Sequence, residues 1–122
     1  MHVTSILLSP PEVAIISLKG MIDHGTAGSL HLELVSLLAR GYTRIVLDCT
    51  KATVICSMAY GAICQVTDRC RKAGGDLRLV GINDHMHRIL EVLMIVDWLT
   101  FCKDVDAAVA SFRPTPDLED TL

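Results

Sequence analysis

The sequence predicts an α/β domain in which a mixed, mainly parallel sheet is covered by helices, with the element order β-β-α-β-α-β-α-β-α. Three observations favour this class. The chain has 122 residues, enough for one domain with a real core, and 51% of them are hydrophobic. Short apolar runs at residues 45–47 and 77–82 are typical of central strands. Such runs alternate with segments of helical periodicity, which indicates parallel strands joined by right-handed crossovers.

Two strands are expected at the start of the chain. Residues 2–8 and 13–20 are runs of β-favouring side chains. Pro10 and Pro11 lie between them and cannot donate hydrogen bonds to a sheet ladder, so they separate the two strands. The two runs are therefore expected to form a hairpin or an edge pair.

The first helix is expected to begin at Asp23 or Thr26, both of which are favourable capping residues, and to end at Gly41. A compact strand of the buried type follows over residues 43–50. The apolar residues that recur at helical spacing in the first helix are Leu30, Leu34, Leu37 and Leu38.

A second helix is expected to begin at Ser57, whose hydroxyl would cap it, and to end at Gly74 and Gly75. A capping serine stabilises a helix by about 1 kcal/mol relative to alanine. Basic residues gather in the last turns of this helix, where the helix dipole favours them. The expected inward face comprises Ala59, Ile63, Val66 or Thr67, and Cys70.

The remaining residues complete the alternation of strands and helices. A strand over residues 76–82 precedes a helix over residues 83–96, which Asn83 or Asp84 would cap. This helix is apolar on most sides, so part of its surface is expected either to mediate association or to pack against the last strand.

A short strand over residues 97–103 and a helix over residues 104–112 end the predicted fold. A single domain is therefore expected over residues 1–112. Residues 113–122 are polar and contain proline, which predicts a disordered tail.

Composition argues against several classes of protein. The net charge is -3 with charges of mixed sign, whereas a nucleic-acid-binding protein needs a basic face. No apolar run reaches the roughly 18 residues of a membrane span, and the N-terminal segment does not resemble a signal peptide, so a cytoplasmic protein is expected. The cysteines are odd in number and form no C-x-x-C pair, which predicts free thiols and no metal site. They are Cys49, Cys56, Cys64, Cys70 and Cys102.

The motifs do not predict catalysis. Cys56 and Ser57 lie at a strand-to-helix turn where a nucleophile could act, but the turn lacks the G-x-S-x-G pattern of hydrolases and no histidine can be assigned as a base. The chain contains neither a P-loop nor a G-x-G-x-x-G motif. We therefore expect that the protein is not an enzyme and uses no cofactor.

Several local motifs carry a family resemblance. Residues 18–23 read L-K-G-M-I-D, and residues 26–27 add T-A at the start of a helix. Residues 45–50 read I-V-L-D-C-T before the turn at Ser57. Further on, K-A-G-G-D-L-R-L-V-G-I-N occupies residues 72–83 and R-I-L-E-V-L-M-I-V-D-W-L occupies residues 88–99.

In these motifs and in its element order the chain resembles the STAS domain family, and within it the anti-sigma factor antagonists, over about residues 3–112. The family signature is usually D-S-[ST]-G-x-G, and here it reads C-S-M-A-Y-G over residues 56–61. The resemblance implies that Ser57 is the phosphoacceptor. Cysteine, methionine and alanine stand in place of the aspartate, the Ser/Thr and the first glycine, and Met94 replaces a glycine that is common in the third helix.

The resemblance implies a bacterial signal-transduction protein that regulates transcription by binding other proteins. Its partner would be an anti-sigma factor with a serine-kinase ATPase domain; binding would free a sigma factor, and a phosphate on Ser57 would weaken binding. The alternative is a STAS domain in a transporter-associated or sensory complex, where Ser57 is only a cap. A homodimer is also left open. The residues implied in partner binding are Asp23, His24, Thr26, Cys56, Ser57, Met58 and Tyr60.

Overall fold

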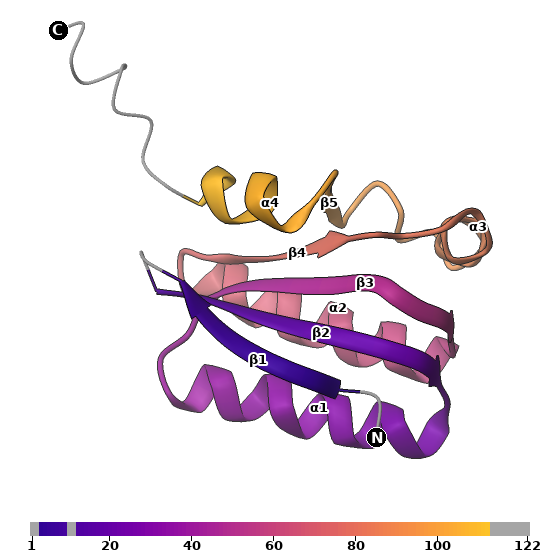
Figure 1. Cartoon of the computed structure of the whole chain (residues 1–122), viewed down its shortest axis with the longest axis horizontal. Coiled ribbons are helices and arrows are strands. Elements are labelled where there is room, and N and C mark those ends of the chain that lie inside the picture. The colour runs from indigo at the N-terminus through magenta and orange to yellow at the C-terminus, as the bar shows by residue number, and fades with distance from the viewer. Residues whose placement is uncertain (1–2, 10–11, 113–122) are drawn as a thin grey trace, which may run out of the picture.

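The computed structural model describes residues 3–9 and 12–112, and the side chains from residue 12 onward. Within this part of the chain, strands and helices follow one another in the predicted order (Figure 1). The elements are β1 (Val3–Ser9), β2 (Val13–Ile22), α1 (His24–Ala39), β3 (Arg44–Ile55), α2 (Ser57–Lys72), β4 (Asp76–Val80), α3 (Asp84–Val92), β5 (Thr100–Cys102) and α4 (Val105–Ser111). The predicted tail, residues 113–122, lies outside the described residues.

The strands form one mixed sheet in the order β1-β2-β3-β4-β5. β1 pairs with β2 antiparallel, as expected for the N-terminal pair, and the other neighbours pair parallel. The predicted α/β class with a mainly parallel sheet is therefore confirmed. β3 lies in the middle of the sheet and β4 lies between β3 and β5, so both apolar runs occupy interior strands.

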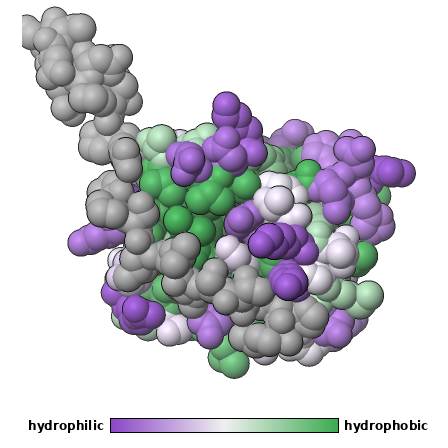
Figure 2. All heavy atoms as spheres, in the orientation of Figure 1, coloured by the Kyte–Doolittle hydropathy of each residue, from purple (hydrophilic) through white to green (hydrophobic). Residues whose placement is uncertain are grey.

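Both faces of the sheet are covered, so neighbouring residues along a strand are buried on opposite sides. On one face, Ile45 and Leu47 pack with α1, α2 and α3 in the larger core. On the other face, Val46 packs against α4 in a smaller cluster that includes Val109 and Phe112. Figure 1 shows α1 and α2 on one side of the strands and α4 on the opposite side, and Figure 2 shows apolar residues gathered over the strands on the face toward the viewer.

Side-chain caps begin three of the four described helices. Asp23 Oδ1 accepts a hydrogen bond from the amide of Thr26 at 3.0 Å and caps α1. Asn83 Oδ1 accepts from the amide of Met86 at 2.8 Å and caps α3. In α4 the cap is Asp104. The choice of Asp23 and Asn83 as caps is confirmed. No described helix is both long enough and apolar enough to cross a bilayer.

The third helix ends earlier than residue 96, so that prediction is wrong. The amide of Met94 donates to the carbonyl of Glu91 at 3.0 Å, and the amide of Ile95 donates to that of Leu90 at 3.1 Å. These two bonds form a Schellman motif, which turns the chain out of the helix after Val92. A second turn follows, in which the amides of Trp98 and Leu99 donate to the carbonyl of Ile95. The predicted strand residues 97–99 therefore lie outside β5, which is only three residues long.

Met94 occupies the position of this motif that normally requires glycine. Its φ of 61° is left-handed, while glycines hold the equivalent place after α1 and α2, where Gly41 has φ 91° and Gly74 has φ 88°. The Met94 side chain is 88% exposed, so it gains no burial in the described chain that would offset the strain. That part of the surface of the predicted third helix, including Met94, mediates association stays a prediction.

Replacing Met94 with glycine is therefore expected to stabilise the fold by about 1 kcal/mol, because a left-handed conformation strains residues that carry a Cβ. Met94→Ala is the matched control, since it removes the same side chain but keeps the Cβ. The free energy of unfolding, measured in urea, should rank glycine above alanine. If alanine proves as stable as glycine, the left-handed turn is not strained.

Candidate functional site

The candidate site lies at the carboxyl edge of the sheet, where β2 leads into α1 and β3 leads into α2. Ile22 pairs with Ile55 in the parallel ladder, and the amide of Cys56 donates to the carbonyl of Ile22 at 2.9 Å. These bonds place Asp23 and the start of α1 at His24 beside the first turn of α2. The structure therefore brings together the two segments that the sequence singled out.

Ser57 is the first residue of α2, and its side chain is exposed. The capping position belongs to Cys56, which is extended (φ −73°, ψ 159°) and makes no side-chain cap bond. The prediction that Ser57 caps α2 is therefore wrong by one residue. The physical reason is the ladder, because the bond from Cys56 to β2 keeps the chain extended through that residue.

Exposed apolar side chains lie close to Ser57 in the chain or in the adjoining ladder. Met58 is 54% exposed, and so is Met21 near the end of β2. Met21 pairs with Val54, which is 38% exposed, near the end of β3. Met58 was predicted to contact a partner, and its exposure permits that role. Met21 and Val54 were not predicted as site residues, because the predicted strands ended at residues 20 and 50 whereas β2 and β3 extend to Ile22 and Ile55.

Asp23 and Thr26 are linked by their own hydrogen bonds. Besides accepting from the Thr26 amide, Asp23 Oδ1 lies 3.0 Å from Thr26 Oγ1, which also donates to the Asp23 carbonyl at 3.1 Å. Their observed contacts are those of a helix start. His24 is exposed beside them. Asp23 and His24 are therefore both accessible, while Thr26 is half-buried and its bonds to Asp23 fix the start of α1.

Tyr60 does not belong to the exposed site, and its predicted contact with a partner is wrong. Its side chain is fully buried, because three positions after Ser57 the helix turns this residue toward the sheet. Its hydroxyl oxygen has no hydrogen-bond partner within the described chain. Burial, with lesser contributions from Cys49 and Cys56, raises the pKa of Tyr60, so the hydroxyl is neutral.

Tyr60→Phe is expected to raise the free energy of unfolding by about 1 kcal/mol, because it removes a buried hydroxyl that lacks a partner. Partner binding should not change. Tyr42→Phe is the control: Tyr42 is only half-buried, and its replacement should alter stability by less than about 0.5 kcal/mol. A loss of stability in Tyr60→Phe would mean that the hydroxyl is hydrogen-bonded in solution.

The cysteines of the site region are free thiols, as are the other cysteines of the chain. Burial raises the pKa of Cys49 to about 12 and that of Cys70 to about 11, so both stay protonated at neutral pH. Cys56 is half-buried against the larger core. Among the described residues, no three histidine, cysteine or acidic side chains are grouped so that they could hold a metal ion.

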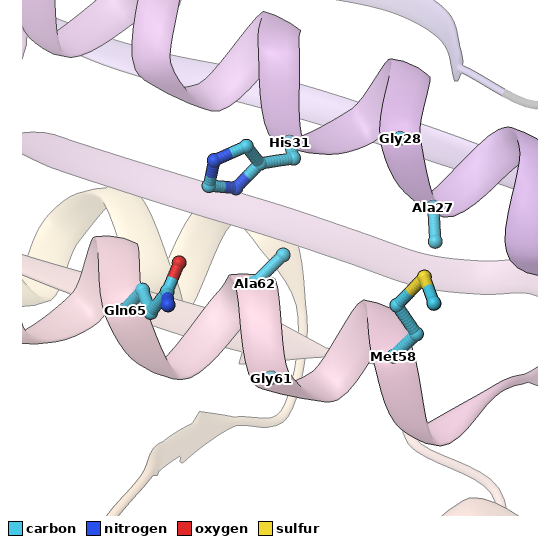
Figure 3. Close-up of a pocket in the computed structure, with 7 residues that line it drawn as sticks. All are labelled: Ala27, Gly28, His31, Met58, Gly61, Ala62 and Gln65. Atoms are coloured by element: carbon cyan, nitrogen blue, oxygen red, sulfur yellow. The ribbon is translucent and has the colours of Figure 1, made fainter.

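A groove between α1 and α2 adjoins the site. Its volume is about 470 Å³, and Met58, the residue after Ser57, forms part of its wall. Figure 3 shows His31 reaching from α1 toward α2, Gln65 reaching from α2 toward α1, and Met58 directed toward Ala27. The other lining residues are Gly28, Gly61 and Ala62. The sequence analysis missed this groove, because Gly28 and Gly61 lie inside helices rather than at their ends.

Comparison with known proteins settles the family. The model of the STAS domain matches residues 6–108, and the chain belongs to the STAS domain family. A curated relative, BtrV of Bordetella bronchiseptica, is described as an anti-sigma factor antagonist. It is 25% identical over 99 residues, which cover 81% of this chain and 85% of BtrV.

Solved structures of other proteins share the fold. One from Thermotoga maritima, described as an anti-sigma factor antagonist, has a TM-score of 0.82 at 19% identity and covers 90% of this chain and 94% of its own. The phosphorylated form of the Bacillus cell fate determinant SpoIIAA has a TM-score of 0.72 at 15% identity, covering 89% and 98%. A sulfate transporter family protein from Wolinella succinogenes has a TM-score of 0.69 at 22% identity, covering 86% and 87%. At these identities the likeness concerns the fold alone.

Proposed function

We propose that this STAS domain is an anti-sigma factor antagonist that acts by binding and not by catalysis. Its partner is a cytoplasmic anti-sigma factor with a serine-kinase ATPase domain, and phosphorylation of Ser57 weakens the complex. The observation that carries the proposal is an exposed serine at the first position of α2, followed directly by the exposed Met58. The name of the curated relative BtrV supports the same role.

The unphosphorylated site suits a protein partner. Met21, Val54 and Met58 expose apolar surface that a partner would remove from water, and burial of apolar area drives association. Ser57 immediately precedes Met58 in the first turn of α2 and carries no charge. A partner that covers Met58 therefore also covers the serine.

A phosphate on Ser57 would oppose this contact without unfolding the domain. It adds a charge of about -1.5 to -2, which the amides at the start of a helix tolerate well. On the partner's side, the same charge would have to lose its water against Met58 and its apolar neighbours, which is costly without a matching cation. The switch therefore acts on the docking surface. The existence of a phosphorylated form of SpoIIAA supports this mode of control.

The second candidate is a STAS domain that docks on a transporter or a sensory protein. The similarity of the fold to that of a sulfate transporter family protein supports this second candidate. In that case Ser57 would carry no phosphate, and the apolar side chains around it would contact a different partner.

Calorimetric titration separates the two candidates. The purified chain should bind an anti-sigma factor with a serine-kinase ATPase domain from the same genome, and should release the sigma factor from a preformed complex. The proposal fails if no such protein binds, and it is replaced by the second candidate if the chain instead binds the cytoplasmic part of a transporter.

A further inference from the structure

The groove between α1 and α2 contains two glycines whose presence the fold does not explain. Gly28 and Gly61 lie inside α1 and α2, where each costs about 1 kcal/mol relative to alanine. Neither is among the glycines with a left-handed backbone. A Cβ built on either would meet no atom of another residue within 4 Å. The effect of the two glycines is to keep the groove open.

His31 presents an unpaired polar atom at the other end of the groove from Met58. Its Nδ1 is buried and has no hydrogen-bond partner in the part of the chain that the structure describes. The ring extends from α1 across the groove toward α2 (Figure 3). A buried polar atom without a partner costs about 1–3 kcal/mol, and a rotation of the His31 ring that turns Nδ1 toward a polar group of an occupant would remove this cost.

The lining defines the chemistry of the occupant. The groove walls include no Asp, Glu, Lys or Arg, so nothing in them would neutralise a charged ligand. The lining positions recur at helical spacing, at residues 27, 28 and 31 on α1 and at residues 58, 61, 62 and 65 on α2, and four of these residues are small: Ala27, Gly28, Gly61 and Ala62. Small side chains along two neighbouring helices allow a third helix to approach closely and place its own side chains between them.

We propose that this groove receives the apolar face of a helix from the same anti-sigma factor that covers Ser57. The inference rests on the proposed function. Met58 links the groove to the Ser57 turn, because it follows Ser57 in the chain and also lines the groove. The partner would contact the Ser57 turn and extend one helix along the groove, with one polar group reaching His31. The phosphate would then stand at the mouth of an apolar groove.

The test fills the groove without disturbing the domain. Gly61→Leu and Gly28→Leu introduce apolar side chains from opposite walls, into space that a Cβ can enter freely. The matched control is Ser29→Leu, which adds the same side chain at an exposed position next to Gly28 that does not line the groove. Circular dichroism should show each variant folded, and the glycine replacements should melt at or above the wild-type temperature.

Affinity for the anti-sigma factor decides the proposal. Both groove variants should bind at least tenfold more weakly than wild type, and Ser29→Leu within twofold of it. If both folded groove variants bind like wild type while wild type binds well, the groove inference is overturned and the proposed function stands. If wild type itself fails to bind, the proposed function has failed first. The oligomeric state gives one more outcome that would contradict the proposal. If the wild-type chain is dimeric, and the two groove variants are monomeric but bind the anti-sigma factor unchanged, then a second copy of the chain occupies the groove.

Discussion

Ser57→Asp should weaken binding to the anti-sigma factor by about 100-fold or more while leaving the domain folded. The carboxylate would occupy the first position of α2, where the helix dipole favours negative charge by about 0.3–1 kcal/mol. The stability of the Ser57→Asp variant should therefore equal or exceed that of wild type. In the complex, however, the charge would be desolvated beside Met58, and a 100-fold loss corresponds to about 2.7 kcal/mol.

Ser57→Ala is the control that separates the charge from the loss of the hydroxyl. Because Cys56 and not Ser57 holds the capping position, the replacement should cost less than about 0.5 kcal/mol of stability. Partner binding should stay within a few-fold of wild type. Calorimetry for affinity and urea unfolding for stability give both quantities. Equal affinities for Ser57→Asp and wild type would exclude Ser57 as the switch.

Asp76→Ala should cost about 3 kcal/mol of stability. Asp76 is 7% exposed and pairs with two guanidinium groups, through Oδ1 to Arg71 Nε at 2.8 Å and through Oδ2 to Arg78 Nε at 3.2 Å. Removing the carboxylate leaves two largely buried cations without their partner. Arg71 also donates to the carbonyl of Trp98 at 2.7 Å, so the network joins α2 and β4 to the segment before β5.

The same network predicts how stability depends on pH. Burial alone would raise the pKa of Asp76, but the hydrogen bonds from Arg71 and Arg78 outweigh it and hold the pKa below its usual value. A lowered folded-state pKa contributes stability that is present above the unfolded-state pKa of about 3.9 and is lost as pH falls through the folded value. The stability difference between wild type and Asp76→Asn should therefore shrink as pH falls from about 5 to about 2.

Asp68→Asn is the matched control for this network. Asp68 pairs with Lys72 at 2.9 Å, but its side chain is half exposed, and such pairs contribute little. Its replacement should change stability by less than about 0.5 kcal/mol at neutral pH. If Asp76→Ala and Asp68→Asn lower the free energy of unfolding in urea by the same small amount, the buried carboxylate does not hold these elements together.

Much of the fold could be predicted because its signals are local. The alternation of apolar runs with segments of helical periodicity predicted the order of elements, and the capping residues Asp23 and Asn83 marked the starts of their helices. The errors came where tertiary contacts override local preference. The amide of Cys56 pairs with β2, which makes Cys56 and not Ser57 the residue at the capping position of α2. A Schellman turn ends α3 at Val92 although methionine stands where glycine is expected.

The candidate site was predictable in part for the same reason. Motif spacing located Ser57 and the loop after β2, but it could not show that Tyr60 faces inward. Met21 was missed because its exposure depends on how far β2 and β3 pair. The groove required the structure, since Gly28 and Gly61 line one groove only after α1 and α2 pack.

The most direct test of the account compares the unphosphorylated chain with the same chain carrying a single phosphate on Ser57. The phosphorylated form would be prepared with the anti-sigma kinase and ATP, and its site confirmed by peptide mass spectrometry. Calorimetric affinity for the same kinase is the measurement. The account predicts binding at least 100-fold weaker for the phosphorylated chain, with the far-UV spectrum unchanged. Equal affinities for the two forms, or a phosphate that the kinase places on another residue, would contradict it.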